Sequence, residues 1–341
     1  MRVVSLFAGC GGLDLGLIKA GHEVVYASDF DQDCVLTYAN NIGDHIHLED
    51  VHDLQGDNLP EFDILTGGFP CQGFSVANIY RNNGDKRNEL YIQIVRILNE
   101  TKPRFFLAEN VPGILSLGKG AVAKMIHKEF SEIGIHEGYP GYEVNIYLLN
   151  AANYGVPQNR KRVIFLGISK EVDYINRKIF FNNFPPPKTH SGKQDDNLPN
   201  LKSLHDSIGD LPEPGHENPD HLPNHYGTKH RVKINGYIGN RALKWEKPGP
   251  TIVGRGGGTG GPVIAVHPNL DRRFTVRETA RIQTFPDNFK FYGSTSSQFR
   301  QIGNAVAVDF AYHLGMFLKN YELGRLTNTE KNPIQLELVL P

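Results

Sequence analysis

The 341-residue sequence has few cysteines, no long apolar run and almost no net charge, and each absence excludes a class of protein. Its three cysteines, Cys10, Cys34 and Cys71, are too few and too scattered for a disulfide framework or a zinc site. We therefore expect reduced thiols and no metal. No apolar run approaches the ~18 residues that a membrane span needs, and the first residues lack the layout of a signal peptide. These features predict a cytoplasmic protein without a membrane partner.

The net charge of −1 hides an uneven distribution. Residues 227–300 hold 13 Lys or Arg against 4 Asp or Glu, a local charge of +9, and the remaining residues carry −10. Such a block is either a solvated face or a polyanion-binding surface, because phosphate contacts come from clustered Lys and Arg. Composition alone leaves both interpretations open.

The first third of the chain alternates short apolar runs with segments of helical spacing. The runs predict strands near 2–7, 24–27, 45–48, 62–65 and 105–108. The segments between them predict helices near 13–20, 32–40 and 88–99. This alternation is typical of an α/β fold with a doubly wound, mostly parallel sheet.

The second half of the chain is less regular. Strands are expected at 144–150 and 163–167, a capping box at Thr275 and Glu278 predicts a helix over 275–283, and a last helix is expected to open at Gln301 and run to about Tyr321. Between them, residues 185–270 are rich in Pro, Gly, Asn and His and begin with a run of prolines. We expect a first domain over 1–184, a smaller loop-rich domain over 185–295, and a C-terminal helix over 296–341 that returns to the first domain.

Glycines and acidic residues fall where the predicted parallel strands end, the edge at which such sheets bind ligands. The turn after the first strand is Gly-x-Gly-Gly, which differs from the spacing of dinucleotide binders. Asp29 lies about 20 residues later, at the end of the second strand. An acidic residue at that position is suited to accept hydrogen bonds from the two hydroxyl groups of a ribose. Together they indicate an adenosine-containing ligand without a pyrophosphate, which favours S-adenosylmethionine over NAD.

Cys71 lies in a loop of small residues, Gly67 to Ser75, after an apolar strand. A single cysteine is more often a buried structural residue than a nucleophile. Two further features accompany it: Glu109 ends another strand, and Arg160 and Arg162 alternate into a strand and so share a face, where they could hold an anion or a carbonyl. Polar surroundings with arginines would favour the thiolate of Cys71.

Six segments, in this order, resemble the DNA (cytosine-5) methyltransferases, and closely resemble the compact bacterial restriction–modification members. They are Phe-Ala-Gly-Cys-Gly-Gly at 7–12, Gly-Gly-Phe-Pro-Cys-Gln at 67–72, Glu-Asn-Val at 109–111, Gln-Asn-Arg-Lys-Arg at 158–162, Arg-Arg-Phe-Thr-Val-Arg-Glu at 272–278 and Gln-Ile-Gly-Asn-Ala-Val at 301–306. The resemblance implies a Rossmann-like S-adenosylmethionine-dependent methyltransferase sheet with a smaller target-recognition domain. It also implies a functional, not necessarily physical, restriction endonuclease partner, and a monomeric enzyme.

The resemblance assigns expected roles to individual residues. Cys71 attacks C6 of a flipped cytosine, Glu109 holds N3, and Arg162, with Arg160 beside it, holds the O2 side. The cofactor pocket is expected to comprise Phe7, Gly9, Gly11, Gly12, Asp29, Phe30, Asp50, Val51, Pro70 and Asn304. The expected contacts with double-stranded DNA are Gln72, Ser75, Arg87, Arg255, Gly256, Gly257, Arg272 and Arg273.

Other functions stay open on the sequence. Transfer RNA could replace DNA as the substrate, as in eukaryotic relatives of the family, although the basic, glycine-rich segment favours duplex DNA. A DNA-binding regulator without activity is a second alternative, and the intact Cys71, Glu109 and Arg162 argue against it. The ligand motifs of a zinc deaminase are missing from the sequence.

Overall fold

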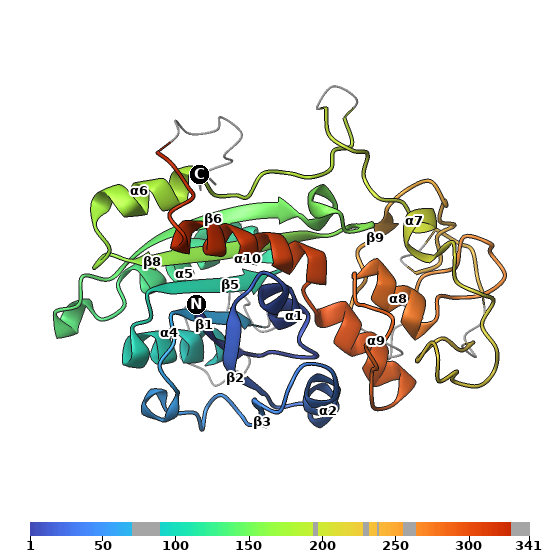
Figure 1. Ribbon diagram of the computed structural model, residues 1–341, viewed down its shortest axis with the longest axis horizontal. Helices are drawn as coiled ribbons and strands as arrows, with labels where there is room; N and C mark the ends of the chain where they lie inside the picture. Colours follow the sequence, from blue (N-terminus) through green and yellow to red (C-terminus); the bar gives the residue numbers. More distant parts are fainter. Residues whose placement is uncertain (70–88, 194–196, 228–231, 237–238, 255–263, 329–341) are drawn as a thin grey trace.

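A computed structural model of the chain describes residues 1–69, 89–193, 197–227, 232–236, 239–254 and 264–328. Its centre is a seven-stranded sheet with the order β3-β2-β1-β4-β5-β8-β6 (Figure 1). The strands are β1 Arg2–Leu6, β2 Glu23–Asp29, β3 Ile46–Leu48, β4 Ile64–Gly68, β5 Phe105–Asn110, β6 Tyr142–Asn150 and β8 Lys161–Ser169. β8 runs antiparallel to both of its neighbours, β5 and β6, and the other strand pairs of this sheet are parallel. The expected α/β fold with a mostly parallel sheet is confirmed.

Helices cover both faces of the sheet. One hydrophobic core holds side chains of α1 (Gly12–Lys19), α2 (Gln32–Asn41), α6 (Tyr174–Asn182) and α10 (Val308–Glu322). The core on the other face holds side chains of α4 (Glu89–Thr101) and α5 (Ala121–Ser131). In β5, Phe105 and Leu107 face the first core and Phe106 and Ala108 the second, because successive strand side chains point to opposite faces.

The C-terminal helix α10 returns to the N-terminal helix α1. A methyl group on Gly16 of α1 would lie 2.4 Å from the Ala311 Cβ, and one on Gly12 would lie 2.3 Å from the Val306 carbonyl oxygen. The two segments therefore approach backbone to backbone. This contact places the segment before α10 beside the glycine-rich turn after β1.

A third hydrophobic core lies at the other end of the molecule, on the right of Figure 1, and comes mainly from the loop-rich part of the chain. It is built from α7 (Leu204–Ile208), α8 (Val276–Ile282), α9 (Thr295–Asn304) and loops between them. Two short strands, β7 (Gln158–Asn159) and β9 (Gly249–Pro250), pair in parallel and join this part to the main sheet.

The predicted helix opening at Gln301 is wrong at its start. Gln301 to Asn304 end α9, Ala305 is extended, and α10 begins only at Val308. The capping box at Thr275 and Glu278 is confirmed at the start of α8. Capping depends on neighbours in sequence, whereas the break between α9 and α10 depends on contacts with distant segments that are described below.

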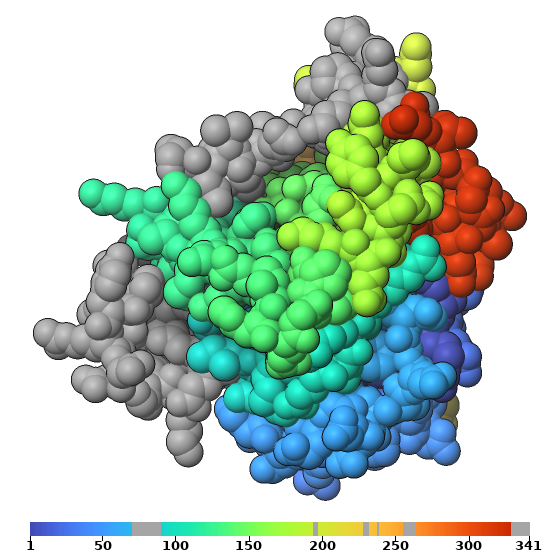
Figure 2. Space-filling model, turned by 90° about the vertical axis from the view of Figure 1, so that its left-hand side faces the viewer, coloured from blue at the N-terminus to red at the C-terminus, as the bar shows by residue number. Residues whose placement is uncertain are grey.

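The end of the described chain lies beside α6, as the red and yellow-green segments in Figures 1 and 2 show. The Asn183 side chain donates a hydrogen bond of 2.8 Å to the Thr327 carbonyl. Among the described residues, no helix combines the length and apolar character that crossing a membrane would require.

Candidate active site

A cavity of about 1020 Å³ opens at the carboxyl ends of the parallel strands. One side is formed by the turn after β1 and the end of β2. The opposite side is formed by the ends of β4 and β5, the start of β8, the chain at 251–254 and the residues between α9 and α10. This is the edge at which the sequence placed its glycine-rich turn and acidic residues, and it is where parallel α/β sheets bind ligands.

The glycine-rich turn is fixed by Asp29 at the end of β2. The Gly9 amide donates to Oδ2 of Asp29 at 2.8 Å, and the Asp31 amide donates to Oδ1 at 2.9 Å. Phe7 has φ 54° and Gly9 has φ 57°, the left-handed region that a side chain disfavours. Burial is the main cause that raises the pKa of the Asp29 carboxyl. Each carboxylate oxygen keeps a second lone pair for a ligand hydroxyl.

This side of the cavity suits the nucleoside of S-adenosylmethionine. A methyl group on Gly9 would have no atom within 4 Å, so bare backbone faces open space there. Phe30 follows Asp29 in the cavity wall and leaves 72% of its surface exposed, as an aromatic platform for a purine would. Among the described residues, no group of three or more His, Cys, Asp or Glu side chains is placed to hold a metal ion.

The predicted cofactor residues divide into two sets. Phe7, Gly9, Gly12, Asp29, Phe30 and Asn304 all line the cavity. Gly11, Asp50 and Val51 are not in its wall. Gly11 caps α1 with φ 85° and abuts Ile42 and Tyr38, Asp50 bonds to His52, and Val51 is buried in the core. Direct cofactor contacts by these three residues remain predictions.

Glu109 and Arg162 meet at the far side of the same cavity. Arg162 Nε lies 2.5 Å from Glu109 Oε1, and both side chains are almost buried, with 7% and 10% exposed. Burial lowers the pKa of the Arg162 guanidinium, and the negative charge of Glu109 opposes that shift. The pair comes from the ends of the neighbouring antiparallel strands β5 and β8. The structure thus presents a carboxylate and a guanidinium together, a suitable set for holding a planar polar ligand.

Asn110 joins this pair to the segment that precedes Cys71. Its Nδ2 donates to the Phe69 carbonyl at 2.9 Å, its Oδ1 accepts from the Val111 amide, and the side chain is buried. The predicted site residues Pro70, Cys71, Gln72, Ser75, Arg87, Arg255, Gly256 and Gly257 lie outside the described residues. Their roles remain predictions.

Arg160 does not share the position of Arg162, which corrects the expectation that the two act on one ligand. Its side chain is 1% exposed and donates to three backbone carbonyls, those of Ile252, Gly303 and Ala305, at 2.7–2.8 Å. Burial is the main cause that lowers the pKa of its guanidinium. The hydrogen bonds direct this guanidinium into the protein interior.

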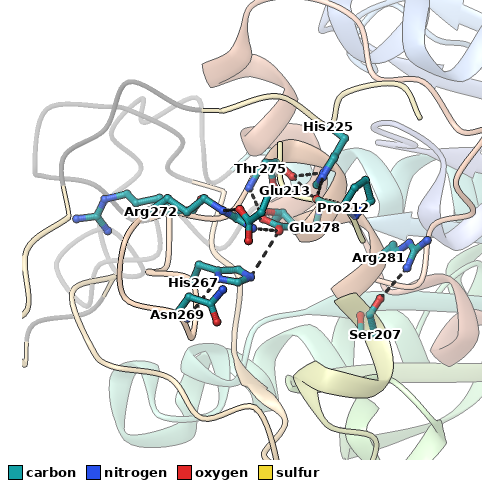
Figure 3. A network of polar contacts seen from close by, with 12 residues as sticks. Ser207, Pro212, Glu213, His225, His267, Asn269, Arg272, Thr275, Glu278 and Arg281 are labelled. Carbon is teal, nitrogen blue, oxygen red and sulfur yellow. Dashed lines mark hydrogen bonds and ion pairs between the residues drawn. The ribbon is translucent and has the colours of Figure 1, made fainter. Parts of the chain in front are cut away.

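Arg272 and Arg273, two of the predicted DNA contacts, are engaged within the protein, and their contacts with DNA remain predictions. Arg272 donates two hydrogen bonds of 2.9 Å to the fully buried Glu278 carboxylate and one of 3.0 Å to Glu213, a network that Figure 3 shows. Arg273 is 1% exposed and donates to the carbonyls of Gly239 and Ile264 and to Asn240. These two arginines of the basic block therefore help to hold the loop-rich part together, because they donate to buried oxygens.

Several cavity residues were missed in the sequence. The chain at 251–254, from the loop-rich part, forms cavity wall beside Asn304. Asn150, Asn159 and Lys161 also line the cavity near Arg162. Asn159 and Lys161 lie within the Gln-Asn-Arg-Lys-Arg segment at 158–162, and residues 251–254 open the glycine-rich segment, so the sequence gave a signal for these stretches. Asn150 is an ordinary polar residue whose position depends on the tertiary structure.

The family described as C-5 cytosine-specific DNA methylase matches residues 1–320. The type II methyltransferase M.FnuDI of Fusobacterium nucleatum is 36% identical over 99% of this chain and 98% of its own length. The type II methyltransferase M.NgoPII of Neisseria gonorrhoeae is 34% identical over 94% of this chain and 95% of its own.

Solved structures give a similar result. A DNA modification methyltransferase encoded within a prophage of E. coli superimposes with a TM-score of 0.71 at 26% identity, covering 95% of this chain and 99% of its own. The Dnmt2 methyltransferase of S. pombe superimposes with a TM-score of 0.64 at 18% identity, covering 95% and 99%. The latter likeness concerns the fold.

Proposed function

This chain belongs to the C-5 cytosine-specific DNA methylase family, and from that premise we propose that it methylates cytosine at C5 within a specific double-stranded DNA sequence. It is a DNA (cytosine-5-)-methyltransferase, and its relatives are type II methyltransferases. The proposed biological role is that of the modification half of a restriction–modification system, with a restriction endonuclease as its functional partner.

One observation carries the proposal. The Asp29–Phe30 side and the Glu109–Arg162 pair line a single cavity, so a nucleoside cofactor and a flipped base could meet inside it. Asn110 holds the Phe69 carbonyl at the same place. Cys71 follows Phe69 by two residues in the sequence.

The residue types match what the reaction requires. C5 of cytosine is a weak nucleophile, so Cys71 first adds its thiolate to C6, which makes C5 electron-rich. Glu109 holds or protonates N3 and so limits the charge that builds up on the ring, while Arg162 fixes the carboxylate and approaches the O2 side. Once C5 carries the methyl group, loss of the C5 proton to water re-forms the C5–C6 double bond, and the electron pair of the Cys71–C6 bond leaves with the thiolate. Two easier steps thereby replace one difficult step.

Asp29 would accept hydrogen bonds from the ribose hydroxyls, Phe30 would stack on the adenine, and the bare backbone at Gly9 would face the methionine part. When bound, S-adenosylmethionine supplies the electrophilic methyl group that C5 takes up. The cytosine must leave the duplex to enter a cavity of this kind, at a cost of a few kcal/mol. Contacts made by residues 72–87 and by the loop-rich part are proposed to offset that cost.

The test is transfer of labelled methyl groups from S-adenosylmethionine to DNA. We expect label at C5 of cytosine within one short sequence, which bisulfite sequencing of DNA from an expressing host would identify. Cys71→Ala should abolish transfer while the purified variant still binds S-adenosylhomocysteine. Full activity of Cys71→Ala would refute the mechanism, and preferential methylation of transfer RNA would refute the substrate.

Partners can be tested separately. DNA from the expressing host should become resistant to a restriction endonuclease that recognises the same sequence. Sedimentation of the free enzyme is expected to give a single 38.1 kDa species, the mass of one chain.

A further inference from the structure

Three buried side chains form a polar junction where the loop-rich part meets the main sheet. They are Gln158 in β7, Arg160 just after it, and Gln283 just after α8, and all are at most 1% exposed. Gln158 Nε2 donates to Gln283 Oε1 at 2.9 Å. We call this group the buried junction.

The junction holds the cavity wall at Ile252, whose backbone amide and carbonyl are both hydrogen-bonded to it. The Ile252 amide donates to Gln158 Oε1 at 2.8 Å, and the Ile252 carbonyl accepts from Arg160 Nη1 at 2.7 Å. The Thr251 hydroxyl adds a bond of 2.6 Å to the Asn159 carbonyl. Residues 251–254 are therefore fixed against the strand that leads into Arg162.

The junction also holds the end of α9. Arg160 Nη2 donates to the carbonyls of Gly303 and Ala305, and Gln283 Nε2 donates to those of Ile302 and Ala305. These carbonyls lie at the negative end of the helix dipole, which favours a cation. The arrangement explains how the Arg160 guanidinium is tolerated in the interior. It also explains why the chain does not continue as one helix from α9 into α10, because these carbonyls are bonded to side chains of distant segments.

The two segments held in this way are in direct contact at the cavity. A methyl group on Gly254 would lie 1.7 Å from Asn304 Oδ1, and one on Gly303 would lie 2.5 Å from the Val253 carbonyl group. The chain at 251–254 and Asn304 both line the cavity. A small shift of one segment must therefore displace the other, because the contact has no free space.

We propose that Gln158, Arg160 and Gln283 are positioning residues that set the distance between the 251–254 wall and the cofactor side of the cavity. The inference rests on the proposed function, since it takes S-adenosylmethionine as the occupant. It assigns Arg160 a role different from that of a base-holding residue: its guanidinium aligns the wall and touches neither substrate nor cofactor. A displacement of about 1 Å at a reacting centre can cost roughly 100-fold in rate.

The test compares Arg160→Lys with Arg277→Lys. Arg277 is a matched control because it is fully buried and also donates to three backbone carbonyls, those of Pro223, Pro286 and Phe289, none of which lines the cavity. In both variants lysine keeps the positive charge but loses the planar fork of donors. A purely structural role would affect both variants alike.

We expect Arg160→Lys to weaken the binding of S-adenosylhomocysteine, measured by calorimetry without DNA, by roughly 10- to 100-fold, and to raise the KM for S-adenosylmethionine while lowering kcat. Arg277→Lys should lower the melting temperature with an unchanged dissociation constant and KM. Equal dissociation constants for Arg160→Lys and the unchanged protein would overturn the proposal. So would losses of affinity in both variants that follow their melting temperatures.

Gly254→Ala keeps the test decisive if Arg160→Lys does not fold. This variant keeps the hydrogen bonds of the junction, but the added methyl group pushes residues 251–254 and Asn304 apart. It should therefore also weaken the binding of S-adenosylhomocysteine. Unchanged affinity would contradict the inference. If the unchanged protein binds S-adenosylhomocysteine but transfers no methyl group to DNA, the proposed function fails while the comparison of binding constants still decides the role of the junction.

Discussion

Asp14, in the first turn of α1, should make the stability of this protein depend on pH in a defined direction. Its side chain is fully buried, Ser5 Oγ donates to its Oδ1 at 2.7 Å, and the Tyr38 hydroxyl also interacts with the carboxyl. Burial is the main cause that raises the pKa of this carboxyl from 3.8 to about 6. The folded protein thus favours the neutral acid more than the unfolded chain does.

The magnitude follows from the two pKa values. A difference of one pKa unit corresponds to about 1.4 kcal/mol, so the favourable contribution of neutral Asp14 amounts to ~3 kcal/mol. Because the pKa is raised on folding, this contribution is fully present below about pH 4 and is lost as the pH rises to about 6 and above. Asp14→Asn cannot ionise, so it should be more stable than the unchanged protein at pH 8, by up to ~3 kcal/mol, and should show little gain at pH 4.

The assay is urea-induced unfolding of both proteins between pH 4 and pH 8. Asp57→Asn, at an exposed carboxylate, serves as the control and should change the free energy of unfolding by less than about 0.5 kcal/mol at every pH. The reasoning is refuted if the difference between Asp14→Asn and the unchanged protein does not grow with pH, or if the variant is the less stable protein at pH 8.

Three further predictions concern the loop-rich part and the cavity. Glu278→Gln should lower the free energy of unfolding by ~3 kcal/mol, because it leaves Arg272 without its buried partner. Glu213→Gln, at a side chain that is 68% exposed, should lower it by less than about 1 kcal/mol. Chemical denaturation measures both losses, and equal losses would contradict the argument. Asn110→Asp should lower kcat at least tenfold with DNA affinity kept, because a carboxylate cannot donate to the Phe69 carbonyl; steady-state kinetics with a gel-shift control decide. Phe30→Ala should weaken S-adenosylhomocysteine binding roughly tenfold through lost stacking, which calorimetry would detect, and an unchanged constant would exclude the adenine platform.

Sequence reasoning succeeded where neighbouring residues are sufficient. Short apolar runs and helical spacing located β1, β2, β5 and α4 within a few residues, and the order of strands and helices indicated the parallel sheet. The capping box of α8 is set by residues three positions apart. Asp29 and Glu109 could be placed at one edge because the carboxyl ends of parallel strands share it.

Arg160 and Arg162 show where local reasoning ends. The two arginines are two residues apart and share a strand face in sequence, yet one lines the cavity and the other does not. The acceptors that bind Arg160 lie 92, 143 and 145 residues away. Arg272 and Arg273 also donate to oxygens of distant segments within the loop-rich part. From the sequence alone, both are expected to contact DNA.

The sequence by itself therefore determined the sheet, the ligand-binding edge and the residue types of the site, because these depend on periodicity and on chain order. Only the tertiary structure decided which arginines face the cavity, where α9 ends, and that 251–254 form part of the wall. The physical reason is that a buried polar side chain must find hydrogen-bonding partners, and here those partners come from segments far along the chain.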